Sequence, residues 1–140
     1  MESNGIHVLI IEDDAIARSA YVELLSRWGF QTRSAHNGLA ALVQMRRAKP
    51  DILLSDLNMP LMNGYELLAI VRRLYPEVRT IAMSASYPEN EMPPNVDADA
   101  FYPKGGGQTG RLLALLDEVA HAPLRSGGAA RRVAAPAPVG

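Results

Sequence analysis

Short apolar runs alternate along this chain with longer segments in which apolar residues recur at helical spacing. The first run, residues 7–11, is almost wholly apolar, which is typical of a strand covered on both faces. Further strands are predicted at residues 31–35, 51–55, 80–83 and 98–102. Parallel strands require crossover connections, so the alternation predicts an α/β fold: a doubly wound five-stranded parallel sheet with helices on both faces.

The polarity of the strands predicts their order in the sheet. Residues 31–35 and 98–102 are more polar than the other three runs and offer less apolar surface to two covering layers, so they belong at the edges. The resulting order is 2-1-3-4-5. In sheets of this kind, functional groups gather at the carboxyl ends of the strands.

Capping residues indicate where the helices begin and end. Asn37 predicts the start of the second helix, which must end before Pro50. Asn63 and Glu66 form a capping-box pair at the start of the third helix. The predicted apolar faces consist of Ala17, Tyr21, Leu24, Leu25 and Trp28 in the first helix, Leu39, Leu42 and Val43 in the second, Leu67, Ile70, Val71 and Leu74 in the third, and Leu112, Leu115, Leu116 and Val119 in the last.

Composition restricts the compartment and the partners. The 140 residues suffice for one domain with its own core. The 14 Lys and Arg against 15 Asp and Glu give a net charge of −1, which favours neither nucleic acid nor a membrane surface as a partner. There is no cysteine, no apolar run of the roughly 20 residues needed to span a bilayer, and no basic N-terminal segment of the signal-peptide type. We therefore expect a cytoplasmic protein.

The C-terminal residues differ in composition from the rest of the chain. From Pro123 onward the sequence is rich in Ala, Gly, Pro and Arg and has no apolar periodicity, so it cannot bury enough surface to offset its ordering entropy. We expect one domain over residues 1–122 and a disordered tail or truncated linker over residues 123–140. The residues after Val119 are too few for a helix-turn-helix unit, so no direct binding of nucleic acid is expected.

Carboxylates follow two strands that the predicted order makes neighbours. The triplet Glu12-Asp13-Asp14 comes directly after the first strand, and Asp56 comes directly after the third. Two carboxylates about 4 Å apart repel by about 4 kcal/mol at an effective dielectric constant near 20, so a proton or a cation must bind among them. The small number of protein ligands, with positions left for water and a phosphate oxygen, favours Mg²⁺. Asp14 is assigned instead to the N-cap of the first helix.

Two further polar residues follow the remaining strands. Ser84 comes after the fourth strand and Lys104 after the fifth, so both are expected at the same edge of the sheet as Asp56. A carboxylate nucleophile, a cation site, a hydroxyl and an ammonium together are typical of a phosphoryl-binding site. Transfer requires the negative oxygens of the phosphoryl group to be neutralised at fixed positions.

Several motifs occur together at the expected spacings: Ile10-Ile11-Glu12-Asp13-Asp14, Asp56-Leu57-Asn58-Met59-Pro60, Gly64, Ser84-Ala85, and Phe101 three residues before Lys104. Over residues 6–121 this combination resembles the response-regulator receiver domains of two-component phosphorelays. The resemblance implies a flavodoxin-like sheet and a signalling domain, not an enzyme, that assists only its own phosphorylation and dephosphorylation. It also implies a sensor histidine kinase or a phosphotransfer protein as phosphodonor, and a downstream protein that the sequence does not identify.

The resemblance implies roles for the acidic residues. Asp56 would accept the phosphoryl group from the donor, giving an acyl phosphate. Glu12 and Asp13 would bind Mg²⁺ together with Asp56 and the backbone carbonyl of Asn58. Glu12 and Asp13 would therefore bind the metal, and Asp56 would both bind the metal and accept the phosphoryl group.

The resemblance implies further roles around the phosphoryl group. Ser84 would donate a hydrogen bond to it, and Lys104 would pair with another of its oxygens. Phe101 would rotate inward as Ser84 moves and so report phosphorylation at the surface, which makes the domain a two-state switch. Asn58 and Ser86 would adjust the lifetime of the phosphorylated state.

The chain departs from the family pattern around its lysine. Receiver domains generally continue from this lysine into proline, often through a cis peptide bond, whereas here Pro103 precedes Lys104 and glycines occupy 105–107. Three consecutive glycines allow many backbone conformations. We therefore expect the position of Lys104 to be less fixed than in the family.

The second departure concerns the fourth helix of the family. Pro88, Pro93 and Pro94 interrupt the short polar stretch where that helix belongs, and an interior proline costs a helix about 3 kcal/mol. We expect this helix to be shortened or absent. Receiver domains commonly signal through a face that includes this helix, so the output surface is expected to differ from theirs.

Three alternative classes share parts of the pattern. A phosphatase of the haloacid-dehalogenase type also uses an aspartate nucleophile with Mg²⁺, but it needs a second aspartate two residues later, where Asn58 cannot act as a general acid. A flavodoxin would hold a phosphate against the triplet at 12–14, which would repel it. A receiver-like module that docks a partner without regulated phosphorylation remains open, because of the interrupted fourth helix and the altered lysine loop.

Overall fold

A computed structural model describes residues 5–85, 93–104 and 109–123. The strands are β1 (His7–Ile11), β2 (Gln31–Ala35), β3 (Ile52–Asp56), β4 (Arg79–Ser84) and β5 (Ala100–Pro103). The helices are α1 (Ala15–Arg27), α2 (Gly38–Arg47), α3 (Gly64–Leu74) and α4 (Thr109–His121). Strands and helices alternate along the described chain as predicted, except between β4 and β5.

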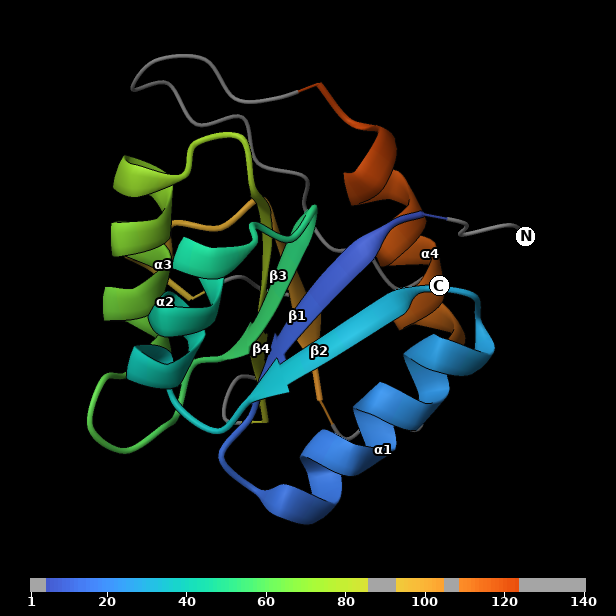
Figure 1. The fold of residues 1–140 in the computed structure, drawn as a ribbon, viewed down its shortest axis with the longest axis horizontal. Coiled ribbons are helices and arrows are strands. Elements are labelled where there is room, and N and C mark those ends of the chain that lie inside the picture. The colour runs from blue at the N-terminus through green and yellow to red at the C-terminus, as the bar shows by residue number, and fades with distance from the viewer. Residues whose placement is uncertain (1–4, 86–92, 105–108, 124–140) are drawn as a thin grey trace.

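The strands pair in parallel in the order β2-β1-β3-β4-β5. Helices α2 and α3 cover one face of the sheet, and α1 and α4 cover the other (Figure 1). The polar strand β2 and the short strand β5 lie at the two edges. The predicted doubly wound, flavodoxin-like sheet is therefore confirmed, together with its strand order.

Strand β1 shows why a continuous apolar run suits a central position. Val8 and Ile10 pack with Leu25 of α1 in the core layer on one face of the sheet. Leu9 and Ile11 pack in the layer on the opposite face, beneath α2 and α3. Successive strand residues point to opposite faces, so a strand covered on both sides must be apolar at every position.

Predicted N-caps begin the helices that leave the carboxyl edge of the sheet. Asp14 Oδ2 accepts the backbone N–H of Ala17 at 2.8 Å, and the side chain of Asn37 caps α2 in the same way. Asn63 and Glu66 form the predicted capping box at α3. These caps satisfy backbone donors that a helix start leaves without intrahelical partners, and they fix where the loops after β1 and β3 end.

The predicted apolar faces are wrong at three positions. Leu39 and Val43 of α2 are each 54% exposed, and Leu74 at the end of α3 is 61% exposed. The face of α2 that meets the sheet carries Ala41 and Met45 instead. Residues two apart lie about 200° apart around a helix, so Leu39 and Val43 point away when Ala41 and Met45 point inward. Of the predicted face of α2, only Leu42 packs against the core, so apolar spacing identified the helix but not the direction of its buried face.

Strand ends and connecting segments also differ in detail from the predictions. Strands β3 and β4 each extend one residue further than predicted, so Asp56 and Ser84 are the last residues of their strands. Described residues 93–99, between β4 and β5, contain no helix, in agreement with a shortened or absent fourth helix. Ser86 and the predicted tail beyond Pro123 lie outside the described residues. No described helix is long and apolar enough to cross a bilayer.

Candidate functional site

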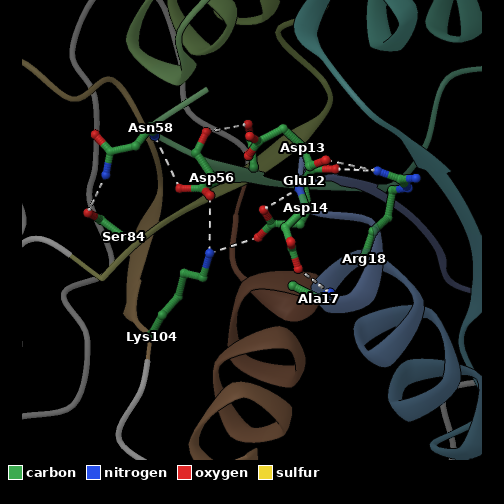
Figure 2. A network of polar contacts seen from close by, with 10 residues as sticks. Glu12, Asp13, Asp14, Ala17, Arg18, Asp56, Asn58, Ser84 and Lys104 are labelled. Atoms are coloured by element: carbon green, nitrogen blue, oxygen red, sulfur yellow. Dashed lines mark hydrogen bonds and ion pairs between the residues drawn. The ribbon is translucent and has the colours of Figure 1, made fainter. Parts of the chain in front are cut away.

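Three carboxylates gather at the carboxyl edge of the sheet (Figure 2). Glu12, Asp13 and Asp56 each offer one oxygen, and these oxygens lie within 4.8 Å of one another. Neighbouring strands β1 and β3 place Ile11 opposite Ser55, so the next residue of each strand reaches the same edge. Glu12 and Asp56 are buried and Asp13 is exposed, so the cluster opens to solvent on the Asp13 side.

Lys104 brings a positive charge to this cluster. Its Nζ donates to Glu12 Oε1 at 2.7 Å and to Asp56 Oδ2 at 3.1 Å. Its backbone N–H donates to the carbonyl oxygen of Ser84 at 2.9 Å, which continues the pairing of β5 with β4. Although Pro103 precedes this lysine, one backbone bond and two ion pairs hold it at the site.

The electrostatics of the cluster favour a further cation. Glu12, Asp13 and Asp56 carry three formal negative charges against the single positive charge of Lys104. Burial raises the pKa of Glu12, although hydrogen bonds from Lys104 and from the Asp14 N–H oppose the shift. Burial lowers the pKa of Lys104, but the hydrogen bond to Glu12 and the charge of Asp56 outweigh it and hold this pKa above its usual range. Lys104 therefore stays charged.

Two contacts hold the loop that carries Glu12. Glu12 Oε2 accepts the backbone N–H of Asp14 at 3.1 Å, and Arg18 Nη1 donates to the carbonyl oxygen of Glu12 at 2.8 Å (Figure 2). Sequence reasoning did not predict the part played by Arg18. It lies six residues from Glu12 and belongs to no motif, so its contact follows only from the turn of the chain from β1 into α1.

Asn58 connects Asp56 to Ser84. Its backbone N–H donates to Asp56 Oδ1 at 3.1 Å, and its Nδ2 donates to Ser84 Oγ at 3.2 Å (Figure 2). Ser84 is completely buried at the end of β4. Together with Lys104, these residues bring a carboxylate, an amide, a hydroxyl and an ammonium to one edge of the sheet.

Phe101 lies apart from this polar group. Its side chain is completely buried in the core layer that contains Leu9 and Leu53, and it pairs in register with Ala82 of β4. The aromatic ring that the resemblance would have rotate inward therefore already occupies an inward position.

The chain is therefore a doubly wound α/β domain with an acidic pocket at the carboxyl edge of its parallel sheet, faced by an ammonium and a hydroxyl. Residues 8–102 match the family model of the response regulator receiver domain. The match covers more than half of the chain, which belongs to this family of two-component signalling domains.

The curated relatives that match this chain are proteins of very different length. Sporulation initiation phosphotransferase F of Bacillus subtilis is 35% identical over 85 residues, which are 61% of this chain and 68% of that protein. Sensor histidine kinase RcsC of Escherichia coli is 32% identical over 85 residues, again 61% of this chain but only 9% of that protein. The chain therefore spans a small part of the longer curated relatives that it matches.

Solved structures agree on the fold. Chemotaxis protein CheY4 of Vibrio cholerae has a TM-score of 0.71 at 26% identity, with 81% of this chain and 98% of that chain covered. Response regulator TrrA of Thermotoga maritima, solved in complex with Mg(2+)-BeF, has a TM-score of 0.73 at 22% identity with the same coverage. The likeness to TrrA supports the fold alone.

Proposed function

We propose that this receiver domain accepts a phosphoryl group on Asp56 from a sensor histidine kinase or phosphotransfer protein, and changes its output surface in response. The observation that carries the proposal is the environment of Asp56. Its carboxylate ends β3 among two further carboxylates, with Lys104 Nζ at 3.1 Å and the Asn58 N–H at 3.1 Å. A nucleophilic oxygen held beside a cation is what phosphoryl transfer needs.

The donor set fits a divalent cation. Three carboxylate oxygens within 4.8 Å of one another, with one exposed member, form an oxygen-rich pocket that solvent reaches. Glu12, Asp13 and Asp56, with the backbone carbonyl of Asn58, would hold Mg²⁺. When bound, the ion would neutralise negative charge on the oxygens of the transferred phosphoryl group.

The chain's own residues account for the rest of the reaction. The carboxylate of Asp56 attacks the phosphorus of a phosphohistidine, so an O–P bond forms as the P–N bond breaks and the imidazole leaves with its electron pair. Lys104 neutralises one phosphoryl oxygen, and the Ser84 hydroxyl, which accepts from Asn58 Nδ2, donates its own proton to another. Hydrolysis of the acyl phosphate then restores the carboxylate and releases inorganic phosphate. Asn58 and Ser86 adjust the rate of that step.

Intact-mass measurement after incubation with acetyl phosphate tests the proposal. We expect a Mg²⁺-dependent phosphoryl adduct in the wild type and none in Asp56→Asn. Asp117→Asn, a change on the outer surface of α4, is the matched control and should keep the adduct. Absence of an adduct at short times, together with no binding of beryllofluoride, would instead favour a docking module without regulated phosphorylation.

A further inference from the structure

Two adjoining clefts lie at the end of the sheet opposite the acidic cluster. The first, of about 430 Å³, is formed where α2 and α3 end. The second, of about 510 Å³, lies beside the starts of β1 and β2. Ala48 and Lys49 line both clefts. In Figure 1, α2 and α3 run away from the carboxyl ends of the strands, so this combined groove lies far from Asp56. We call it the basic groove.

Cations predominate along the basic groove. Arg46, Arg47 and Lys49 line the first cleft, and all three are exposed. Glu77 is the carboxylate among its described lining residues, and it forms an ion pair with Lys49 that lowers the pKa of Glu77. Three cations against one carboxylate leave a net charge of +2. Arg46 and Arg47 also face the partial negative charge of the C-terminus of α2, but that interaction stabilises a helix by only about 0.3–1 kcal/mol.

Apolar side chains line the same cleft. Leu74 is 61% exposed, although it continues the apolar stripe of α3. Beside it, Tyr75 is half-buried and packs against the core, and Met45 is fully buried. An exposed leucine next to uncompensated cations matches a partner segment that carries carboxylates beside a bulky apolar side chain.

Other occupants fit the basic groove less well. Residues 124–140 of the chain contain three arginines and no Asp or Glu, so the cations of the groove would repel them. A nucleic acid would offer phosphates to the arginines but no aliphatic side chain to Leu74, and the net charge of −1 gives the chain no long-range attraction for it. The two adjoining clefts together form a groove that is long enough for a peptide and longer than a single small anion needs.

We propose that the basic groove docks an acidic peptide segment of a partner protein, with carboxylates on Arg46 and Arg47 and an apolar side chain over Leu74. The groove and Asp56 lie at opposite ends of the sheet, so both can be engaged at once. The proposal does not depend on phosphorylation of Asp56.

Fluorescence anisotropy with the full chain tests this docking site. The probe is a fluorescein-labelled peptide, Glu-Asp-Leu-Glu-Phe-Glu-Asp-Leu-Glu, titrated at low and at physiological ionic strength. We expect saturable binding that weakens with salt. The double variant Arg46→Glu/Arg47→Glu should weaken it by at least about tenfold, and Leu74→Ser by about threefold to tenfold. Arg27→Glu, in the corresponding last turn of α1, is the matched control and should change affinity less than about twofold.

Four outcomes would overturn the proposal. These are no saturable binding below about 1 mM peptide, equal weakening in Arg27→Glu, undiminished binding of a peptide with Ser in place of Leu and Phe, or stronger binding of an oligonucleotide of equal charge. Backbone amide shifts in the wild type give a readout that needs no variant. The peptide should shift Leu74 and Tyr75 and leave Asp56 unchanged.

Discussion

Lys104 Nζ lies 2.7 Å from Glu12 Oε1 and so joins two residues that are 92 positions apart in the chain. Glu12 follows β1 and Lys104 follows β5, and strands β3 and β4 lie between these two strands in the sheet. To reach Glu12, the lysine passes Asp56, to which it also donates. One ammonium is thus shared by two buried carboxylates, and it ties the edge strand β5 to the centre of the sheet.

Replacement of Lys104 by Met should expose the repulsion among the carboxylates. The side chain is only 18% exposed, and removal of one partner from a mostly buried ion pair leaves an uncompensated charge. We expect the free energy of unfolding, measured with urea at neutral pH, to fall by about 2 kcal/mol. Added Mg²⁺ should restore more stability in this variant than in the wild type, since the ion can replace the lost charge.

A matched control is available in the exposed ion pair of Lys49 with Glu77. Lys49→Met should cost less than about 0.5 kcal/mol and show no extra response to Mg²⁺, because exposed pairs contribute little. Equal losses in the two variants would mean that Lys104 does not compensate buried charge.

Gly64 touches the backbone of the phosphoacceptor candidate. A Cβ at this position would lie 2.3 Å from the carbonyl oxygen of Asp56 and 2.6 Å from the Cα of Leu57. Gly64→Ala should therefore lower the free energy of unfolding by about 1–3 kcal/mol and reduce the yield of phosphoryl adduct, because the end of β3 must shift. Gly110→Ala in α4, where a Cβ meets nothing within 4 Å, should instead stabilise the domain by about 0.5–1 kcal/mol. Similar losses in both variants would contradict the steric explanation.

Sequence features sufficed for the fold because each acts locally. The apolarity of β1 marks a strand buried on both faces, and side chains such as Asn37 and Asn63 fix helix starts within three residues. The carboxyl edge of the sheet then follows from topology, which brings the predicted residues Glu12 and Asp56 together. These predictions needed no knowledge of distant contacts.

Other features depend on tertiary contacts that the sequence pattern does not contain. The side of α2 that faces the sheet is one example. A Cβ on Gly38 would lie 2.8 Å from the sulfur of Met62, so this helix start lies close against the loop after β3. With the start of α2 placed against this loop, Ala41 is buried and the larger Leu39 is exposed to solvent. The contact of Arg18 with the Glu12 carbonyl is a second example, because it follows from how the chain turns into α1.

The phenol of Tyr21 on α1 should titrate abnormally late. Burial raises the pKa of Tyr21 to about 12; the charge of Lys104 opposes this rise by a smaller amount, and the nearby Glu12 and Asp56 carboxylates add to it. A folded pKa above the unfolded value of about 10 means that the stability from this group is complete below about pH 10 and is lost as the pH rises through about 12. The difference in alkaline absorbance between wild type and Tyr21→Phe should therefore show a step near pH 12, which moves to about pH 10 in denaturant. A step near pH 10 in the folded protein would contradict the burial argument.

The hydrogen bond from Asn58 Nδ2 to Ser84 Oγ should favour phosphoryl transfer to Asp56. At 3.2 Å the hydroxyl accepts from Asn58 and keeps its own proton for a phosphoryl oxygen, so the bond orients the hydroxyl without occupying its donor. A net bond strength of about 0.5–1 kcal/mol corresponds to a rate decrease of roughly twofold to fivefold in Asn58→Ala, measured as the initial rate of adduct formation with acetyl phosphate. In Ser84→Ala the rate should also fall, and adding Asn58→Ala to that variant should give no further decrease, because the hydroxyl that the bond orients is gone. An equal decrease with and without Ser84 would show that Asn58 acts on the rate through another contact.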